Sequence, residues 1–276
     1  MSLKDKVIII TGSSRGIGRE MALRFAKDGA KIVVAAKSVE EGKLPGTIYS
    51  VAKEIEAAGG EALPIQIDLR SDETVEKMVT QTVDAWGRID ILVNNAGAIM
   101  LTPLEQTPMK RADLMLNLNM RAVLCCSHFC IPHLKKAGQG HILSLSPPID
   151  LAPHWFKNHV VYSISKYGMS MATLGLAEEL RAAKVGVNSL WPRTLVASEA
   201  TKMLLGEAGM ANCRTPAIMA DAAYEILTSD PTELTGQTLI DETFLKERGY
   251  TDFEKYKVDP EGTLGMDLFV EGYPVG

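Results

Sequence analysis

The stretch Lys6-Val7-Ile8-Ile9-Ile10-Thr11-Gly12-Ser13-Ser14-Arg15-Gly16-Ile17-Gly18 decides the fold of this chain. Its first part is a short run of apolar, mostly β-branched residues, which is typical of a strand buried on both faces. Its second part is rich in glycine and leads into residues with helical periodicity, for which we predict a helix over Gly16–Asp28. A strand, a glycine-rich turn and a helix in this order open a βαβ unit and therefore predict a parallel sheet.

The glycine-rich turn lies where a nucleotide phosphate would bind. Glycine permits a tight turn and close backbone approach, and the start of a helix offers unpaired N–H groups and a positive dipole end. The spacing Gly-x-x-x-Gly-x-Gly differs from the Gly-x-Gly-x-x-Gly dinucleotide fingerprint, and it lacks the Lys-Ser/Thr ending of a P-loop. The residues that we predict to bind the cofactor here are Gly12, Ser14, Arg15, Gly16, Ile17 and Gly18. A turn with a purely structural role is the alternative.

The rest of the chain alternates between short apolar runs and longer amphipathic segments. Strands are predicted at Lys6–Thr11, Lys31–Ala35, Leu63–Ile67, Ile89–Asn94, His141–Ser146, Val185–Trp191 and Gln237–Ile240. Helices are predicted at Gly16–Asp28, Thr47–Ala58, Asp72–Trp86, Met109–Lys136, Val160–Ala183 and Pro216–Thr228. This order predicts an α/β fold in which helices cover both faces of a doubly wound parallel sheet. No repeat or linker divides residues 1 to about 245, so we expect a single domain over residues 1–276.

Composition excludes several classes of protein. With 46% hydrophobic residues, 23% charged residues and a net charge of -5, the chain is globular and has no basic footprint for nucleic acid or anionic membranes. The first apolar run, Val7–Ile10, is too short for a signal peptide or a membrane span, so we expect a soluble, cytoplasmic protein. Cys126 and Cys130 could share a helix face and bind a metal, but without histidine ligands at finger-like spacing we favour buried or idle cysteines and no metal site.

The residues that follow the second and third predicted strands indicate which dinucleotide binds. A carboxylate after the second strand would bond the ribose 2′-hydroxyl, but residues 35–38 read Ala-Ala-Lys-Ser. Lys37 and Arg15 could both reach the adenosine ribose, so NADP(H) is favoured and NAD(H) is not excluded; the alternative is that Lys37 only solvates a loop. Asp68 could accept the adenine amino group or simply form a turn.

Small residues end the fourth predicted strand at Asn94-Asn95-Ala96-Gly97. Ligands of open parallel sheets bind at the carboxyl ends of the strands. We therefore predict that Asn95, Ala96 and Gly97 lie beside the cofactor, although a plain loop would read the same way.

The stretch Tyr162-Ser163-Ile164-Ser165-Lys166 carries the predicted chemistry. On a helix, Tyr162 and Lys166 are four residues apart and share a face. A phenol is a useful proton donor near neutral pH only if its anion is favoured, and a neighbouring ammonium favours it. Such a pair also arises by chance, so its meaning depends on the other motifs.

Taken together, Thr11–Gly18, Asn94–Gly97 and Tyr162–Lys166 closely resemble the motifs of the short-chain dehydrogenase/reductase family. The resemblance covers about residues 5–241 and implies a Rossmann-like sheet of about seven parallel strands with a nicotinamide cofactor. Within the family the chain is most similar to the hydroxysteroid dehydrogenase-like type 2 branch, through the sequences at residues 46–49, 146–148 and 190–192. That branch carries a following sterol-carrier domain, which we do not expect in these 276 residues.

The resemblance also implies catalytic roles. Tyr162 matches the general acid/base, and Lys166 matches the lysine that holds the nicotinamide ribose and lowers the tyrosine pKa. Asn119 matches the asparagine that helps to hold a proton-relay water, with Asn117 as a less well aligned rival. The position of the family's catalytic serine falls on Pro147. Ser146 could replace it only if the backbone twists, because consecutive strand residues point to opposite faces.

Two further departures from the family affect the site. Trp191-Pro192-Arg193-Thr194 stands where the family has Pro-Gly, and we predict Pro192 and Thr194, with Val196 or Ser198 as alternatives to Thr194, beside the nicotinamide. Asp241-Glu242-Thr243 replaces Asp-Gly-Gly, and residues 245–276 form an acidic, aromatic-containing extension. We expect the extension to pack on the domain or on a neighbouring subunit.

These observations predict an oxidoreductase that transfers a hydride between NADP(H) and a ketone or secondary alcohol, with Tyr162 as the general acid/base. Apolar residues at 149–156 and 195–210 favour an apolar, lipid-like or alicyclic substrate, unless they only fill the core. The alternative from another class is an NADP(H)-binding sensor or scaffold that has lost catalysis with the serine. The resemblance also implies a homodimer or homotetramer formed through the helices at 109–136 and 160–183. Met169, Met171 and Leu174 suit such an interface or, alternatively, the subunit core.

Overall fold

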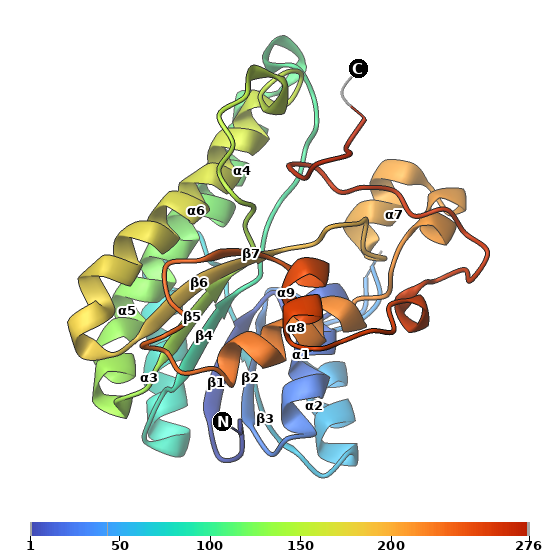
Figure 1. The fold of residues 1–276 in the computed structure, drawn as a ribbon. Coiled ribbons are helices and arrows are strands. Elements are labelled where there is room, and N and C mark those ends of the chain that lie inside the picture. Colours follow the sequence, from blue (N-terminus) through green and yellow to red (C-terminus); the bar gives the residue numbers. More distant parts are fainter. Residues whose placement is uncertain (1, 43, 275–276) are drawn as a thin grey trace.

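The computed structural model describes residues 2–42 and 44–274 of the chain. Seven strands form one sheet: β1 (Val7–Thr11), β2 (Lys31–Ala36), β3 (Glu61–Gln66), β4 (Ile91–Asn94), β5 (His141–Ser144), β6 (Gly186–Trp191) and β7 (Thr238–Ile240). Their order is β3-β2-β1-β4-β5-β6-β7, and every neighbouring pair is parallel. The predicted Rossmann-like sheet is confirmed, with all seven strands at or near their expected places (Figure 1).

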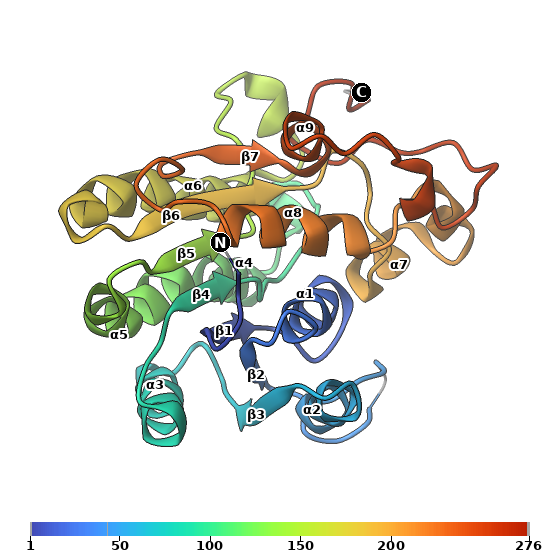
Figure 2. The ribbon, with the colours of Figure 1, turned by 60° about the horizontal axis from the view of Figure 1, so that its bottom comes forward.

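Helices cover both faces of the sheet. One face carries α1 (Gly16–Ala26), α2 (Ile48–Ala57), α8 (Ala217–Leu227) and α9 (Asp241–Glu247), and the other carries α3 (Asp72–Trp86), α5 (Ala122–Ala137) and α6 (Val160–Leu180), as Figure 2 shows. The alternation of β1 explains the two layers, because Ile8 and Ile10 join the first cluster of buried side chains and Ile9 joins the second. The short helix α7 (Glu199–Leu205) lies outside these layers.

The predicted continuous helix at Met109–Lys136 is wrong in one respect. It consists of α4 (Met109–Met115), a π-helical segment (Leu116–Arg121) and α5. Among the described residues, Met109–Ala137 is the one stretch that is long and apolar enough, by length and composition, to cross a membrane. Here Cys126, Cys130 and Leu134 of this stretch are buried against the sheet. Helices that pack on the core of a protein meet the same criteria of length and composition, and this helix packs one face against the sheet.

The C-terminal segment, residues 264–274, is hydrogen-bonded to the loop that follows β6. The Leu195 amide donates to the Gly265 carbonyl at 2.9 Å, and the Asp267 amide donates to the Arg193 carbonyl at 3.1 Å. The Trp191 indole N–H donates to the Leu268 carbonyl at 2.7 Å. Leu268, Phe269 and Val270 are buried in a third apolar cluster, which also contains Tyr162 and Trp191. This segment therefore helps to build the region around Tyr162; it is red and lies beside α7 in Figure 1.

Candidate active site

The turn between β1 and α1 is packed against the end of β4. Gly12 has a φ of +68°, and a Cβ on it would lie 2.8 Å from the Ala96 Cα. A Cβ on Gly18 would lie 2.4 Å from Nδ2 of the Asn95 side chain. The Asn95 side chain donates to the carbonyls of Thr11 and Gly12, at 2.8 Å and 3.1 Å. Only glycine fits at positions 12 and 18, and Asn95 has the role of fixing the turn.

The start of α1 has the features of a phosphate site. Arg15 precedes the helix in an extended conformation, and its side chain does not cap the first turn. No acidic residue lies in that turn, so nothing there repels an anion. Ile17, in the same turn, lines the main cavity described below. The residues present therefore fit a dinucleotide pyrophosphate at this helix N-terminus.

The predicted adenosine end of the site is polar. Arg15 donates to the Ser38 hydroxyl at 2.9 Å and to the carbonyls of Pro45 and Gly46, at 2.9 Å and 2.8 Å. A second cavity of about 420 Å³ adjoins Arg15 and also touches Ser14 and Gly46. All the partners of Arg15 among the described residues are neutral oxygens, so no carboxylate neutralises its charge there.

Asp68 and Lys37 form an ion pair with each other. The Lys37 ammonium lies 3.2 Å from the Asp68 carboxylate, and the Lys37 side chain is 71% exposed. Arg70 donates to the same carboxylate through its side chain and its backbone. The bond from Arg70 is the largest influence on Asp68 and holds its pKa well below the ordinary value. Asp68 is therefore an ionised acceptor whose oxygens are already shared between two cations.

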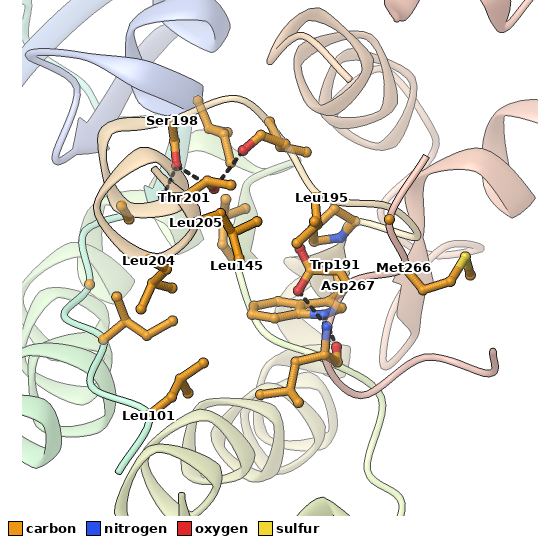
Figure 3. A pocket seen from close by; sticks show the side chains of 18 of the residues that line it. Leu101, Leu145, Trp191, Leu195, Ser198, Thr201, Leu204, Leu205, Met266 and Asp267 are labelled. Carbon is orange, nitrogen blue, oxygen red and sulfur yellow. Dashed lines mark hydrogen bonds between the residues drawn. The ribbon is translucent and has the colours of Figure 1, made fainter. Parts of the chain in front are cut away.

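A cavity of about 810 Å³ is lined by residues that follow β4, β5 and β6, and also by α6, α7 and the C-terminal segment. Most of the lining side chains are apolar: Ile17, Ile99, Leu101, Leu145, Trp191, Val196, Leu204, Leu205, Met266 and Leu268 are among them. Figure 3 shows Leu101, Leu204 and Leu205 around the same space as the Trp191 ring. The cavity is large enough for a nicotinamide and an apolar substrate.

Tyr162 and Lys166 lie one turn apart on α6 and both line this cavity. The Lys166 ammonium donates to the Leu145 carbonyl at 2.8 Å and lies 5.0 Å from the centre of the Trp191 ring. Burial lowers the pKa of Lys166 to about 8, and the Asp267 carboxylate acts in the opposite direction. Burial raises the pKa of the Tyr162 hydroxyl well above its ordinary value, and Asp267 adds to the rise. The predicted pair is brought together, in a setting that makes each charged form costly.

The π-helical segment places Asn119 beside this pair. The Asn119 side chain accepts from the Ala98 amide at 2.7 Å and donates to the Ala98 carbonyl at 3.0 Å and the Ser165 hydroxyl at 2.9 Å. It is fully buried. A Cβ on Gly97 would lie 3.2 Å from its oxygen and 3.8 Å from the Lys166 nitrogen. Asn117 instead donates to the Asp113 carbonyl of its own helix, so Asn119 is the asparagine at the site.

The structure does not bring Ser146 to the cavity wall. The Ser146 hydroxyl is buried, with no hydrogen-bond partner among the described residues, whereas its neighbour Leu145 lines the cavity. Alternation of the chain explains the difference, because consecutive extended residues point to opposite sides. The Pro147 carbonyl accepts a hydrogen bond from the Ser170 hydroxyl at 2.6 Å, which fixes the backbone here. In this conformation neither position 146 nor position 147 offers a donor to the cavity.

The loop after β6 brings Pro192 to the cavity, as predicted, but does not bring Thr194 there. Pro192, Val196 and Ser198 line the cavity. Thr194 does not, since it is buried and its backbone pairs with Met266. The sequence reasoning missed the cavity residues of the C-terminal segment, which are Leu264, Gly265, Met266, Asp267, Leu268, Gly272, Tyr273 and Pro274. The only signal for them was the acidic, aromatic composition of residues 245–276.

No metal-binding cluster is found within residues 2–42 and 44–274, which contain no group of three or more His, Cys, Asp or Glu side chains able to hold an ion. The cysteines Cys125, Cys126, Cys130 and Cys213 are all free and buried. Burial raises the pKa of Cys126 and Cys130, so these thiols are not poised as ligands or nucleophiles.

Comparison with known proteins finds relatives of this chain in one family. The model of the short chain dehydrogenase family matches residues 6–205. Hydroxysteroid dehydrogenase-like protein 2 of Danio rerio is 53% identical over 268 residues, which are 97% of this chain and 64% of that protein. The chain thus spans less than two thirds of that relative. A short-chain dehydrogenase structure from Mycobacterium thermoresistibile is 48% identical, has a TM-score of 0.93 and covers 100% of this chain and 99% of its own.

Two more distant structures contain nicotinamide cofactors. A metagenomic short-chain oxidoreductase in complex with NADP is 29% identical, with a TM-score of 0.72, and the match covers 87% of this chain and 98% of that one. A 7α-hydroxysteroid dehydrogenase complexed with NADH and 7-oxo glycochenodeoxycholic acid is 26% identical, with a TM-score of 0.75, over 87% of this chain and 93% of that one. Structures of this kind therefore include binders of both dinucleotides.

Proposed function

The chain belongs to the short-chain dehydrogenase family of oxidoreductases, and we propose that it interconverts apolar ketones and secondary alcohols with NADP(H) as cofactor. The observation that carries the proposal is the position of Tyr162 and Lys166, one helical turn apart on the wall of an apolar cavity of about 810 Å³. The same cavity reaches Ile17, at the start of α1, so one ligand can extend from the glycine-rich turn to the tyrosine.

The residues that would hold the cofactor follow from the geometry. The first-turn N–H groups of α1, exposed by Gly12 and Gly16, would bind the pyrophosphate. Val196 and Ser198 would lie against the nicotinamide, and the Lys166 ammonium would bind its ribose. When bound, the cofactor supplies or accepts a hydride at the substrate carbon.

Tyr162 would transfer the proton that balances the hydride. Its hydroxyl has no hydrogen-bond partner among the described residues and lies on the cavity wall, so it is available to a substrate oxygen. The Lys166 ammonium, with a pKa of about 8, is mostly charged at pH 7 and lowers the cost of the phenolate. Asn119 keeps the backbone near Ala98 in place through two hydrogen bonds. The catalytic residues in this proposal are Tyr162 and Lys166, and Asn119 is linked to their helix through its hydrogen bond to Ser165.

The preference for NADP(H) rests on charge. The second strand ends without a carboxylate, and the Arg15 guanidinium nearby has only neutral partners among the described residues. Lys37 adds a second, exposed cation. A 2′-phosphate would pair with these cations, whereas the ribose hydroxyl of NAD(H) would gain less. Fluorescence titration with NADPH and NADH should show tighter binding of NADPH by at least about tenfold.

The substrate should be apolar and bulky. Leu101, Leu204 and Leu205 face the cavity, and Met266 and Leu268 close another part of its wall. Such a lining gains free energy from burying hydrocarbon, at roughly 25 cal/mol per Å². A panel of alicyclic and long-chain ketones should therefore be reduced with a lower KM than small polar ketones of similar reactivity.

The experiment that tests the mechanism compares Tyr162→Phe with Tyr167→Phe. Tyr167 lies on the same helix, but its hydroxyl donates to the Asp150 carbonyl and does not line the cavity. We expect NADPH oxidation with an alicyclic ketone to fall by at least about 10²-fold in Tyr162→Phe, because general acid–base catalysis contributes about 10²- to 10⁴-fold. Tyr167→Phe should stay within about twofold of wild type. Wild-type turnover in Tyr162→Phe would disprove the mechanism.

A second candidate function is a sensor or scaffold that binds NADP(H) without turnover. The observation that favours it is the lack of a donor at Pro147 and the burial of the Ser146 hydroxyl. NADPH binding together with no turnover over the whole ketone panel would support this second function against the first.

The homo-oligomer expected through α5 and α6 remains a proposal, with one correction to the residues that would form it. Met169 is fully buried in the subunit and cannot form an interface. Met171 and Leu174 on α6 are 56% and 42% exposed, and Leu124 on α5 is 47% exposed. Exposed apolar side chains on these two helices favour a homodimer or homotetramer, which light scattering at micromolar concentration can test.

A further inference from the structure

The C-terminal segment adds a carboxyl group to the proposed site. Asp267 lines the same cavity as Tyr162 and Lys166, and Figure 3 shows it beside the Trp191 ring. Backbone bonds on both sides fix its place: its own amide donates to the Arg193 carbonyl, and the Leu268 carbonyl accepts from the Trp191 indole. These hydrogen bonds therefore hold residue 267 against the end of β6 and the loop that follows it.

Only one of the carboxyl oxygens is used by the protein. Asp267 Oδ1 accepts from the Leu268 amide at 2.7 Å, and Oδ2 has no hydrogen-bond partner among the described residues. No Lys, Arg or His within those residues forms an ion pair with this carboxylate. An oxygen on a cavity wall without a protein partner is free to bind a ligand in that cavity.

The surroundings of Asp267 favour its neutral form. The groups that interact with it electrostatically are Lys166 and Tyr162 on α6, Asp241 at the start of α9, Cys213 and Tyr273. Burial is the main effect and raises the pKa of Asp267 to about 7; the hydrogen bond from the Leu268 amide opposes the rise, the charge of Asp241 adds to it, and Lys166 opposes it. Near neutral pH a large share of the molecules therefore carries a proton on this carboxyl.

Other donors on the cavity wall are already engaged. The side chains of Asn95, Thr201 and Trp191 donate to backbone carbonyls, and the Ser198 hydroxyl donates to the Thr201 hydroxyl. Besides Tyr162 and Lys166, this leaves Asp267 and Tyr273. Of these two, only Asp267 interacts electrostatically with both members of the catalytic pair.

We propose that the Asp267 carboxyl, through the oxygen that has no protein partner, donates a hydrogen bond to the substrate oxygen beside Tyr162 and so performs the role of the hydroxyl that position 147 lacks. The inference rests on the proposed function. Asp267 keeps its proton throughout: in ketone reduction, Tyr162 gives the proton that the alcohol oxygen gains, and the carbon gains the hydride. A hydrogen bond aimed at the oxygen where charge develops is worth about 10²- to 10³-fold in rate.

The test compares three variants in the full chain, with trans-1-decalone as the alicyclic ketone and NADPH in excess. We expect Asp267→Leu, which has no donor, to lose about 10²-fold in kcat with unchanged NADPH affinity. Asp267→Asn keeps a neutral donor at every pH, so it should retain activity. In the wild type, kcat should fall as pH rises through about 7 and Asp267 loses its proton, whereas kcat of Asp267→Asn should not change over this range. Glu271→Gln removes an exposed carboxylate of the same segment and should behave as wild type.

Two outcomes would overturn the proposal. One is a kcat of Asp267→Leu within about twofold of the wild-type value. If the NADPH affinity of this variant is at the same time reduced more than tenfold, Asp267 is a cofactor ligand. The other needs no turnover: carbon-detected NMR titration of the labelled Asp267 carboxyl giving a pKa below about 5, since no proton would then remain at pH 7. If Asp267→Leu fails to fold, the pH profile of Asp267→Asn and the NMR titration decide the question.

The failure of this inference can be told apart from the failure of the proposed function. An inactive Tyr162→Phe with a fully active Asp267→Leu would reject this inference alone, whereas an active Tyr162→Phe would reject the proposed function.

Discussion

Ser146→Ala separates two explanations of how the site works without the usual serine. Either the backbone rearranges so that Ser146 donates the hydrogen bond to the substrate, or Asp267 donates it. Ser146 directly precedes Pro147 in the sequence, but its hydroxyl is fully buried and has no hydrogen-bond partner among the described residues. If this geometry holds during turnover, the hydroxyl does not reach the substrate. The substitution should then leave kcat and KM within about twofold of the wild-type values.

The same geometry predicts an increase in stability. A buried hydroxyl without a partner costs about 1–3 kcal/mol in lost hydration, and alanine removes that cost. Part of the gain is offset because the removed oxygen leaves a small void with fewer packing contacts. A net stabilisation of about 1 kcal/mol is expected, which corresponds to a rise in Tm of roughly 2 °C for a protein of this size.

The assay combines urea denaturation or calorimetry with initial rates on the same preparations. Ser144→Ala is the matched control, since Ser144 lies on β5 two residues earlier and is also buried. A fall in kcat of more than about tenfold in Ser146→Ala, without a comparable fall in the control, would refute the reasoning. It would mean that the backbone at residues 145–147 rearranges to bring the hydroxyl to the substrate.

Three further predictions concern position 147, the end of β2 and the buried histidine at the start of β5. In the Asp267→Leu background, where the site has no such donor, Pro147→Ser should raise kcat by about 10- to 100-fold and Pro147→Ala should not; equal rates for the two would show that position 147 does not face the substrate. Ala36→Asp places a carboxylate at the end of β2 and should weaken NADPH binding at least about tenfold relative to NADH in fluorescence titrations; an unchanged ratio would argue against the assigned adenosine end. Burial lowers the pKa of His141 from 6.5 to about 4, so the charged form is disfavoured in the folded protein and stability should fall as pH drops from about 6.5 towards 4. His141→Gln should lack this part of the pH dependence in urea denaturation, and an identical dependence would contradict the assignment.

The sequence predicted the fold because the pattern that defines it is local. Each strand of the sheet is a short apolar run, and Gly12 and Gly18 stand where only glycine fits between β1 and the end of β4. The π-helical segment at Leu116–Arg121 could not be predicted, since one extra residue per turn over six residues hardly changes the apolar periodicity of a long helix. Asn119 was expected at the site only through family resemblance, and its hydrogen bonds to Ala98 were not predicted.

The contribution of the C-terminal segment could not be predicted for a different reason. Asp267 reaches the site through backbone pairing with Arg193, and residues so far apart in sequence leave no periodic pattern. Sequence reasoning read the segment as an acidic, aromatic extension and gave it no part in the site. A pairing between irregular segments depends on the tertiary packing around them, and propensity and spacing do not describe that packing.

Phe269 explains why the segment takes this path. Its backbone has a φ of +68°, in the left-handed region that costs a residue other than glycine about 1–2 kcal/mol. Its ring is buried and contacts five other rings, those of Trp155, His159, Tyr162, Tyr167 and Trp191, and it stacks on Tyr162 at 6.2 Å and 22°. Truncating a buried phenylalanine costs about 3–5 kcal/mol, so the packing of the ring exceeds the strain of the backbone. The strained conformation is therefore maintained by the aromatic cluster, and the same cluster contains the proposed proton donor. Because Asp267 is only two residues before Phe269, the contact that buries the ring against Tyr162 also sets where the carboxyl group lies.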